Sequence, residues 1–139
     1  MSSELPLYSS ILVIDDHNMV VISLRLLIGH LFESFYHTRV GADGIGLAIK
    51  VQPQLVIVDN QLPDLAGDIV VRQIKAHCPH TRVLGYSFTM NGAAIRKMSG
   101  SGADGYVDKS EPDTELTRAV EQLMKGNKYF SKEARGHMY

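Results

Sequence analysis

Short apolar runs that end in charged residues are the feature that most constrains the fold of this chain. Ile11-Leu12-Val13-Ile14 is followed by Asp15-Asp16, Leu55-Val56-Ile57-Val58 by Asp59, and Tyr106-Val107-Asp108 by Lys109. Short runs rich in Val and Ile, each followed by a helix-like stretch, are typical of buried parallel strands. Because ligands of open α/β sheets bind outside the carboxyl ends of the strands, we expect these acids and the lysine to converge in space.

Strand and helix patterns alternate along most of the chain. Strands are predicted at about residues 10–15, 35–40, 54–59, 82–87 and 104–108, with helical periodicity after each. The last helix is predicted from Asp113 to Lys125. The helix at about Asn91 to Ser99 is the weakest, because it has Gly92 early and Gly100 and Gly102 directly after it, and each glycine inside a helix costs about 1 kcal/mol relative to alanine. The alternation predicts a parallel sheet with right-handed crossovers and helices on both faces.

Composition limits the classes of protein to which the chain can belong. Its 139 residues suit one domain, and a net charge of −1 with scattered basic residues does not favour a nucleic-acid-binding surface. The single cysteine, Cys78, excludes an internal disulfide and fits a reducing compartment. We find no apolar run of about 18 residues and no signal-peptide pattern in residues 1–10, so we expect a cytoplasmic location and no membrane partner.

The converging carboxylates predict a metal site. Clustered carboxylates repel one another unless a cation lies among them, and hard oxygen ligands suit Mg²⁺. The same positions therefore predict a site for a metal and a phosphoryl group. We place His17 in the first turn of a helix rather than on the metal. His77 and His80, which flank Cys78 and Pro79, are interpreted as a polar turn, because no second ligand pair accompanies them.

Four motifs in order resemble the receiver domain of two-component response regulators. They are Ile-Asp-Asp-His at 14–17, Val-Asp-x-x-Leu-Pro-x-x-x-Gly at 58–67, Ser87 at the end of the fourth strand, and Gly-Ala-Asp-Gly-Tyr-Val-x-Lys at 102–109. The resemblance covers about residues 8–130. Lys109-Ser110 and the segment 126–131 are similar to receivers that precede a LuxR-type helix-turn-helix. The implied fold is a flavodoxin-like, doubly wound (βα)5 with a five-stranded parallel sheet in the order 2-1-3-4-5, comprising a receiver domain at 1–126 and a tail or linker at 127–139.

The resemblance also implies a role for each site residue. Asp59 looks like the phosphoacceptor, and Asp15, Asp16, Asp59 and the backbone carbonyl of Gln61 look like the Mg²⁺ ligands. Lys109 would pair with a phosphoryl oxygen, Ser87 would hydrogen-bond another, and Tyr106 would be the aromatic switch. The implied partners are a sensor histidine kinase or phosphotransfer protein, and a second copy of the chain on phosphorylation. DNA would be bound by an effector domain outside this chain, and the protein would not be a turnover enzyme.

The chemistry of the residues supports these roles independently. Phosphoryl transfer depends mostly on positioning and charge neutralisation, and a carboxylate is an accepted nucleophile for it. Mg²⁺ holds the nucleophile and phosphoryl oxygens together, and a lysine offsets the remaining charge. Two departures from the family pattern stand out. Phe88 replaces a small residue and is expected to crowd the site, and Gly85-Tyr86 replaces aliphatic residues and is expected to loosen packing.

Three alternatives compete with a phosphoacceptor switch. A flavin carrier needs a Ser/Thr/Gly-rich phosphate loop after the first strand, where this chain has two acids. An aspartyl phosphatase generally has a second acid two residues beyond the nucleophile, where this chain has Gln61. A degenerate receiver that acts only as a protein-interaction module is the remaining alternative, which Phe88 favours and the complete set of acids, serine and lysine opposes.

Overall fold

The structure, a computed structural model, describes residues 5–88 and 91–138, in which strands and helices alternate. In chain order the elements are β1 (Tyr8–Ile14), α1 (Asn18–Ile28), a short 3-10 helix η1 (Gly29–Leu31), β2 (Phe32–Thr38), α2 (Gly41–Val51), β3 (Leu55–Val58), α3 (Gly67–His77), β4 (Arg82–Ser87), α4 (Gly92–Gly100), β5 (Gly105–Asp108), α5 (Asp113–Met124), β6 (Tyr129–Phe130) and α6 (Lys132–Met138). The predicted α/β alternation is confirmed.

All the strands run parallel in one sheet with the order β2-β1-β3-β4-β5-β6. The central strands are apolar on both faces, and every residue of β3 is buried. Strands buried on both faces are typical of parallel sheets whose crossover helices cover both sides. The predicted order 2-1-3-4-5 is therefore confirmed for the first five strands.

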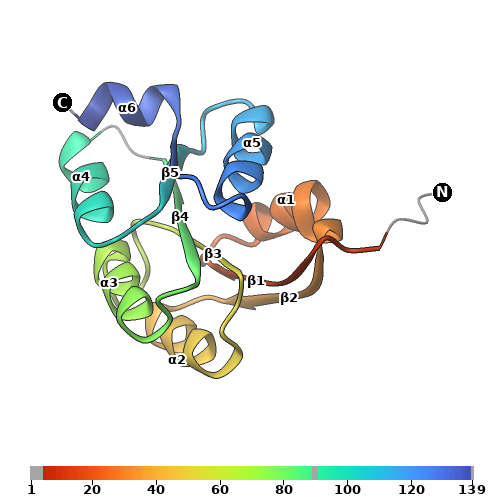
Figure 1. Cartoon of the computed structure of the whole chain (residues 1–139). Coiled ribbons are helices and arrows are strands. Elements are labelled where there is room, and N and C mark those ends of the chain that lie inside the picture. The colour runs from red at the N-terminus through yellow and green to blue at the C-terminus, as the bar shows by residue number, and fades with distance from the viewer. Residues whose placement is uncertain (1–4, 89–90, 139) are drawn as a thin grey trace.

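Two hydrophobic cores lie on opposite faces of this sheet. One contains buried residues of α2, α3, α4 and α6, including Val70, Ile74 and Met98. The other contains buried residues of α1 and α5, including Leu24 and Leu116. Figure 1 shows the same division, with α1 and α5 on one side of the strands and α2, α3 and α4 on the other. The amphipathic pattern of α5 is as predicted, with Leu116, Ala119, Val120 and Leu123 buried.

The tail after residue 126 corrects the prediction of five strands and a loose end. Tyr129 and Phe130 pair with Gly105 and Tyr106 of β5, forming the sixth strand. α6 follows and lies beside α4, with Ala134 buried (Figure 1). The physical reason is that β5 would otherwise leave an open edge of unpaired backbone groups, which β6 satisfies. A two-residue strand carries no periodicity, so sequence pattern alone does not reveal it.

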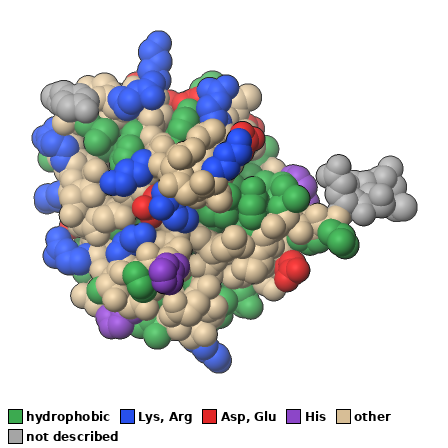
Figure 2. Space-filling model, in the orientation of Figure 1, with side chains coloured by type: hydrophobic (Ala, Val, Ile, Leu, Met, Phe, Trp, Pro, Cys, Tyr) green, Lys and Arg blue, Asp and Glu red, His purple; other side chains and the backbone are tan. Residues whose placement is uncertain are grey.

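Among the described residues, every helix is too short or too polar to cross a membrane. On the face shown in Figure 2, Lys and Arg side chains stand as separate spots with polar and apolar surface between them. This distribution agrees with the scattered basic residues of the sequence.

Candidate functional site

Asp59 is buried where β3 ends, and both of its carboxyl oxygens have partners. Oδ1 accepts a hydrogen bond of 2.6 Å from Ser87 Oγ and one of 3.2 Å from the backbone N–H of Gln61. Oδ2 lies 3.0 Å from Lys109 Nζ. Residues from the ends of β3, β4 and β5 therefore meet at one carboxylate, as the strand-end positions predict.

Lys109 is a buried cation that joins two buried carboxylates. Its Nζ lies 2.8 Å from Asp15 Oδ2 in addition to its contact with Asp59, and only 3% of its side chain is exposed. A buried charge is costly unless it is paired and hydrogen-bonded. The lysine is therefore held by the same acids whose repulsion it offsets.

The two acids after β1 differ in how open they are. The side chain of Asp15 is 3% exposed, and its Oδ1 accepts a 2.8 Å hydrogen bond from the backbone N–H of His17. The side chain of Asp16 is 32% exposed, yet its Oδ1 is buried and has no hydrogen-bond partner among the described residues. A buried oxygen without a partner is costly, and a cation at this point would satisfy it. The carboxylate donors therefore fit a hard divalent ion.

The loop after Asp59 is closed tightly against the start of α3. Gln61 and Ala66 form an isolated bridge, and the backbone N–H of Gly67 donates a 2.7 Å hydrogen bond to Asn60 O. A Cβ on Gly67 would collide with the backbone carbonyl of Asp59 and would lie 2.8 Å from Asn60 Cα. The glycine of the Val-Asp-x-x-Leu-Pro-x-x-x-Gly motif thus permits the close approach that fixes the position of Asp59.

A cleft of about 400 Å³ opens over these residues. It is lined by Asp16, His17, Asp59, Gln61, Leu62, Pro63, Ser87, Phe88 and Lys109. Phe88 is 71% exposed and its ring lies 5.7 Å from Lys109 Nζ, so the ring forms part of the rim. A larger cleft of about 530 Å³ lies between α5 and α6 and is lined by none of the predicted site residues.

The family model described as "Response regulator receiver domain" matches residues 11–121. The chain belongs to the response regulator receiver family. Receivers of this family are parts of two-component signalling systems and are not conventional enzymes. The predicted resemblance is therefore confirmed.

Relatives and solved structures agree with this assignment. The chain is 32% identical over 125 residues to the transcription regulator BvgA of Bordetella pertussis, with 89% of this chain and 60% of that protein covered. It is 24% identical to the response regulator GacA of Pseudomonas aeruginosa, with 87% and 58% covered. The chain thus spans about 60% of the length of the curated relatives it matches.

A LuxR-family response regulator from Aurantimonas sp. SI85-9A1 superimposes with a TM-score of 0.87 at 26% identity, covering 94% of this chain and 95% of that one. The isolated receiver domain of RcsB from Salmonella enterica serovar Typhimurium has the same fold, with a TM-score of 0.84 at 19% identity and coverage of 95% and 99%.

Tyr106 lies in the receiver core, away from the cleft. Its side chain is fully buried, and Asn60 Nδ2 donates a 2.8 Å hydrogen bond to its hydroxyl. A Cβ at position 85 would lie 2.6 Å from the Tyr106 ring and 2.9 Å from Met98 Cε. The expectation that Gly85 loosens the packing is therefore wrong, because the missing side chain makes the space that the ring fills. The role of Tyr106 as a switch stays a prediction.

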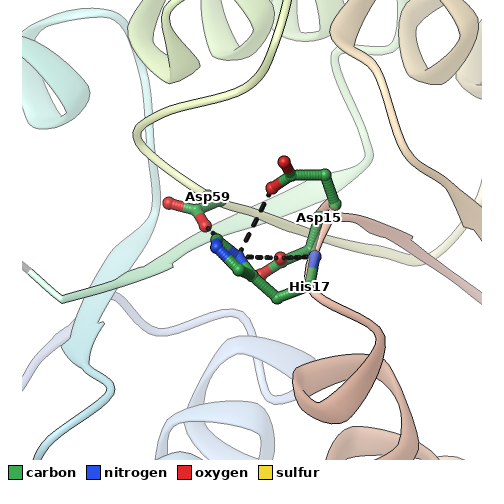
Figure 3. A group of neighbouring side chains, drawn as sticks. Asp15, His17 and Asp59 are labelled. Atoms are coloured by element: carbon green, nitrogen blue, oxygen red, sulfur yellow. Dashed lines mark hydrogen bonds and ion pairs between the residues drawn. The ribbon is translucent and has the colours of Figure 1, made fainter.

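The structure brings Asp15, Asp16, Asp59, Ser87 and Lys109 together as the sequence predicts. Gln61 lines the same cleft, and its role as a carbonyl ligand stays a prediction. Asn60, which connects the loop after β3 to Tyr106, was not foreseen in the site. His17 was placed in the first turn of a helix rather than on a metal. The structure places it just before α1, with its ring directed into the acidic cluster (Figure 3). In the sequence His17 follows Asp16 and Asn60 follows Asp59, which was the available signal. The direction in which each side chain points cannot be read from that position.

Proposed function

We propose that this chain is a phosphoacceptor switch that takes a phosphoryl group onto Asp59 from a phosphohistidine of a sensor histidine kinase or phosphotransfer protein. An oxygen of Asp59 attacks phosphorus, the bond between phosphorus and the donor nitrogen breaks, and the donor imidazole leaves with that electron pair. The observation that carries the proposal is the buried contact of Lys109 and Ser87 with opposite oxygens of Asp59.

The chain's own residues supply most of what the transfer needs. Lys109 is placed to follow the developing charge from the carboxylate onto a phosphoryl oxygen, and Ser87 has a hydroxyl to donate to another. Asp15, Asp16, Asp59 and the Gln61 carbonyl would hold Mg²⁺. When bound, the ion neutralises charge on the phosphoryl oxygens and orients the group for in-line transfer.

The signal would then leave the receiver through a changed output surface. The length of BvgA and GacA beyond the matched part supports an effector domain outside this chain that regulates transcription. Under this proposal the receiver itself does not contact DNA and forms a homodimer on phosphorylation. We further propose that the segment 127–139, whose β6 and α6 pack on the receiver, leads from it to the effector.

The test is labelling of the purified chain with acetyl phosphate, with and without Mg²⁺, followed by intact mass measurement. The expected result is a mass increase of one phosphoryl group that requires Mg²⁺ and is lost in Asp59→Asn. Labelling that persists in Asp59→Asn or in EDTA contradicts the site. A chain that stays unlabelled under all conditions supports the alternative, an interaction module that works without phosphorylation.

A further inference from the structure

His17 contributes a ring nitrogen to the acidic cluster. Its Nδ1 lies 2.9 Å from Asp15 Oδ1, 3.3 Å from Asp16 Oδ1 and 3.5 Å from Asp59 Oδ2. Figure 3 shows the ring lying between the carboxyl groups of Asp15 and Asp59. The side chain is 61% exposed, so the ring approaches the acids from the open side of the cleft.

The 2.9 Å contact of Nδ1 with Asp15 Oδ1 is a hydrogen bond when that ring nitrogen carries the proton, and the same spacing suits two atoms that share a cation. Ligands of a small divalent ion at about 2.1 Å lie about 3.0 Å apart when they are adjacent in an octahedron. A nitrogen in the cation's own position would instead be about 2.1 Å from each oxygen. One ligand atom from each of Asp15, Asp16, His17 and Asp59 lies within 4.8 Å of all the others, so these four side chains could hold one ion after a small adjustment.

The backbone holds His17 in this position. The residue immediately precedes α1 in an extended conformation, with φ −95° and ψ 106°, and its side chain makes no capping hydrogen bond to that helix. Its backbone N–H is fixed by Asp15 Oδ1 at 2.8 Å. The ring is therefore not needed to begin the helix, and a cation shared with Asp15 would replace its hydrogen bond to Asp15 Oδ1.

We propose that His17 is a ligand of the cation in this site and that it shifts the selectivity of the site toward divalent ions that accept nitrogen. Mg²⁺ favours oxygen ligands, whereas imidazole suits later first-row ions such as Co²⁺, Ni²⁺ and Zn²⁺. In the metal-bound site the neutral ring gives the Nδ1 lone pair to the ion and carries its proton on Nε2. The inference rests on the proposed function, because its three carboxylates are those of the phosphoacceptor site.

The experiment compares Co²⁺ and Mg²⁺ binding to the whole chain by calorimetry and records the visible absorption spectrum of the Co²⁺ form. Loss of an outer-shell partner alone typically weakens a metal about tenfold or more, so His17→Ala is expected to weaken Co²⁺ by at least about tenfold. The Co²⁺ spectrum should change with the loss of a nitrogen ligand, whereas Mg²⁺ affinity should stay within about twofold. His77→Ala, which removes an exposed ring on α3, is the matched control and should change the affinity for neither ion.

Retained Mg²⁺ binding in His17→Ala shows that the carboxylates are still in place. The inference is overturned if Co²⁺ affinity and spectrum are unchanged in His17→Ala, or if both ions weaken or strengthen by the same factor. If Asp59 of the wild-type chain is not labelled, the proposed function is contradicted instead. The comparison of Co²⁺ with Mg²⁺ would still decide whether His17 is a ligand.

Discussion

At the scale of single residues, Phe88 is placed to limit access to Asp59, the proposed phosphoacceptor. Its ring stands at the rim of the cleft that contains Asp59 and Lys109. An aromatic side chain in that position is expected to shield the carboxylate from small donors and its phosphorylated form from water. The ring does not fill the site, since it is mostly exposed, so its effect should be on rates rather than on the capacity for labelling.

Phe88→Ala is therefore expected to speed labelling by acetyl phosphate and to speed the later loss of the phosphoryl group to water. Time courses of intact mass measure both rates. Leu26→Ala, which truncates a similarly exposed apolar side chain on α1, is the control and should leave both rates unchanged. Equal rates in Phe88→Ala and wild type would show that the ring does not shield Asp59.

Asp16 gives a second prediction at this scale, because its buried Oδ1 has no hydrogen-bond partner among the described residues. Mg²⁺ is expected to raise the melting temperature of the unphosphorylated chain by relieving repulsion among the acids. At a Mg²⁺ concentration ten times the dissociation constant, the gain in the free energy of unfolding is about 1.4 kcal/mol. Asp16→Asn should reduce this response, measured by thermal melts over a Mg²⁺ series. Identical responses in both proteins would show that Asp16 is not part of the metal site.

At the scale of elements, α2 begins with a cap supplied by a distant loop. Val40 at the N-cap makes no side-chain capping hydrogen bond. Instead, Asp64 Oδ1 accepts from the backbone N–H of Gly41 at 2.7 Å, and Oδ2 accepts from that of Ala42 at 2.9 Å. These hydrogen bonds lower the pKa of the Asp64 carboxyl below its usual value. The bond from Ala42 lowers it most, and the bond from Gly41 is next. A side chain from the loop after β3 thereby joins that loop to α2.

The lowered pKa of Asp64 determines the direction in which the stability of the fold changes with pH. The folded-state pKa lies below the unfolded value of about 3.9, so the stabilisation is present above about pH 4 and is lost as the pH falls through the folded-state pKa. Asp64→Asn is expected to lower the melting temperature at neutral pH, with the difference from wild type shrinking as the pH falls below about 4. Melts across a pH series check this, with Glu33→Gln at the exposed position of β2 as the control for the loss of one charge. A difference that is constant with pH would contradict the cap.

The elements that the sequence predicts well are those with a continuous apolar run or a clear helical repeat of apolar residues. The central strands and α5 were predicted to within a few residues, because continuous apolar runs and the helical repeat are properties of the local chain. β2 begins at Phe32 rather than near residue 35, since η1 ends at Leu31 and the chain extends at once. β6 and α6 depend on the free edge of β5 and the surface of α4, which exist only after folding. The strand-end acids and Lys109 were predictable from topology, whereas the directions of His17 and Asn60 were not.

At the scale of the whole molecule, α6 covers the surface through which we expect the signal to leave. We expect that surface to be formed by α4, β5 and α5, and α6 packs directly against α4 and β5. The backbone N–H of Ser131 donates to Tyr106 O at 3.0 Å, and the Ser131 hydroxyl bonds to the Glu111 carboxylate. Glu111 also accepts from the backbone N–H of Asp108, the residue before Lys109. The start of α6 is thus tied to the strand that carries the site lysine.

Beryllofluoride, a mimic of the phosphoryl group, is accordingly expected to change amide hydrogen exchange most between Ser87 and Tyr106 and in α6. Movement of Ser87 and Lys109 toward the new acceptor would shift the conformational equilibrium of β5 and α4. The glycines of α4 leave that helix little intrinsic stability. Ser87→Ala should reduce these changes, because it removes the hydroxyl that contacts Asp59. Changes concentrated in α1 and α5, or changes that Ser87→Ala leaves intact, would contradict this route.

The contact between Asp15 and Lys109 has a consequence for the synthesis of the protein. The two residues are 94 positions apart in sequence, and nothing but the folded sheet brings them together. A growing chain on the ribosome that has not yet produced β5 holds the phosphoacceptor without the lysine that completes its surroundings. Under the proposed function, such an unfinished chain is expected to accept a phosphoryl group poorly, so phosphorylation would be confined largely to finished chains.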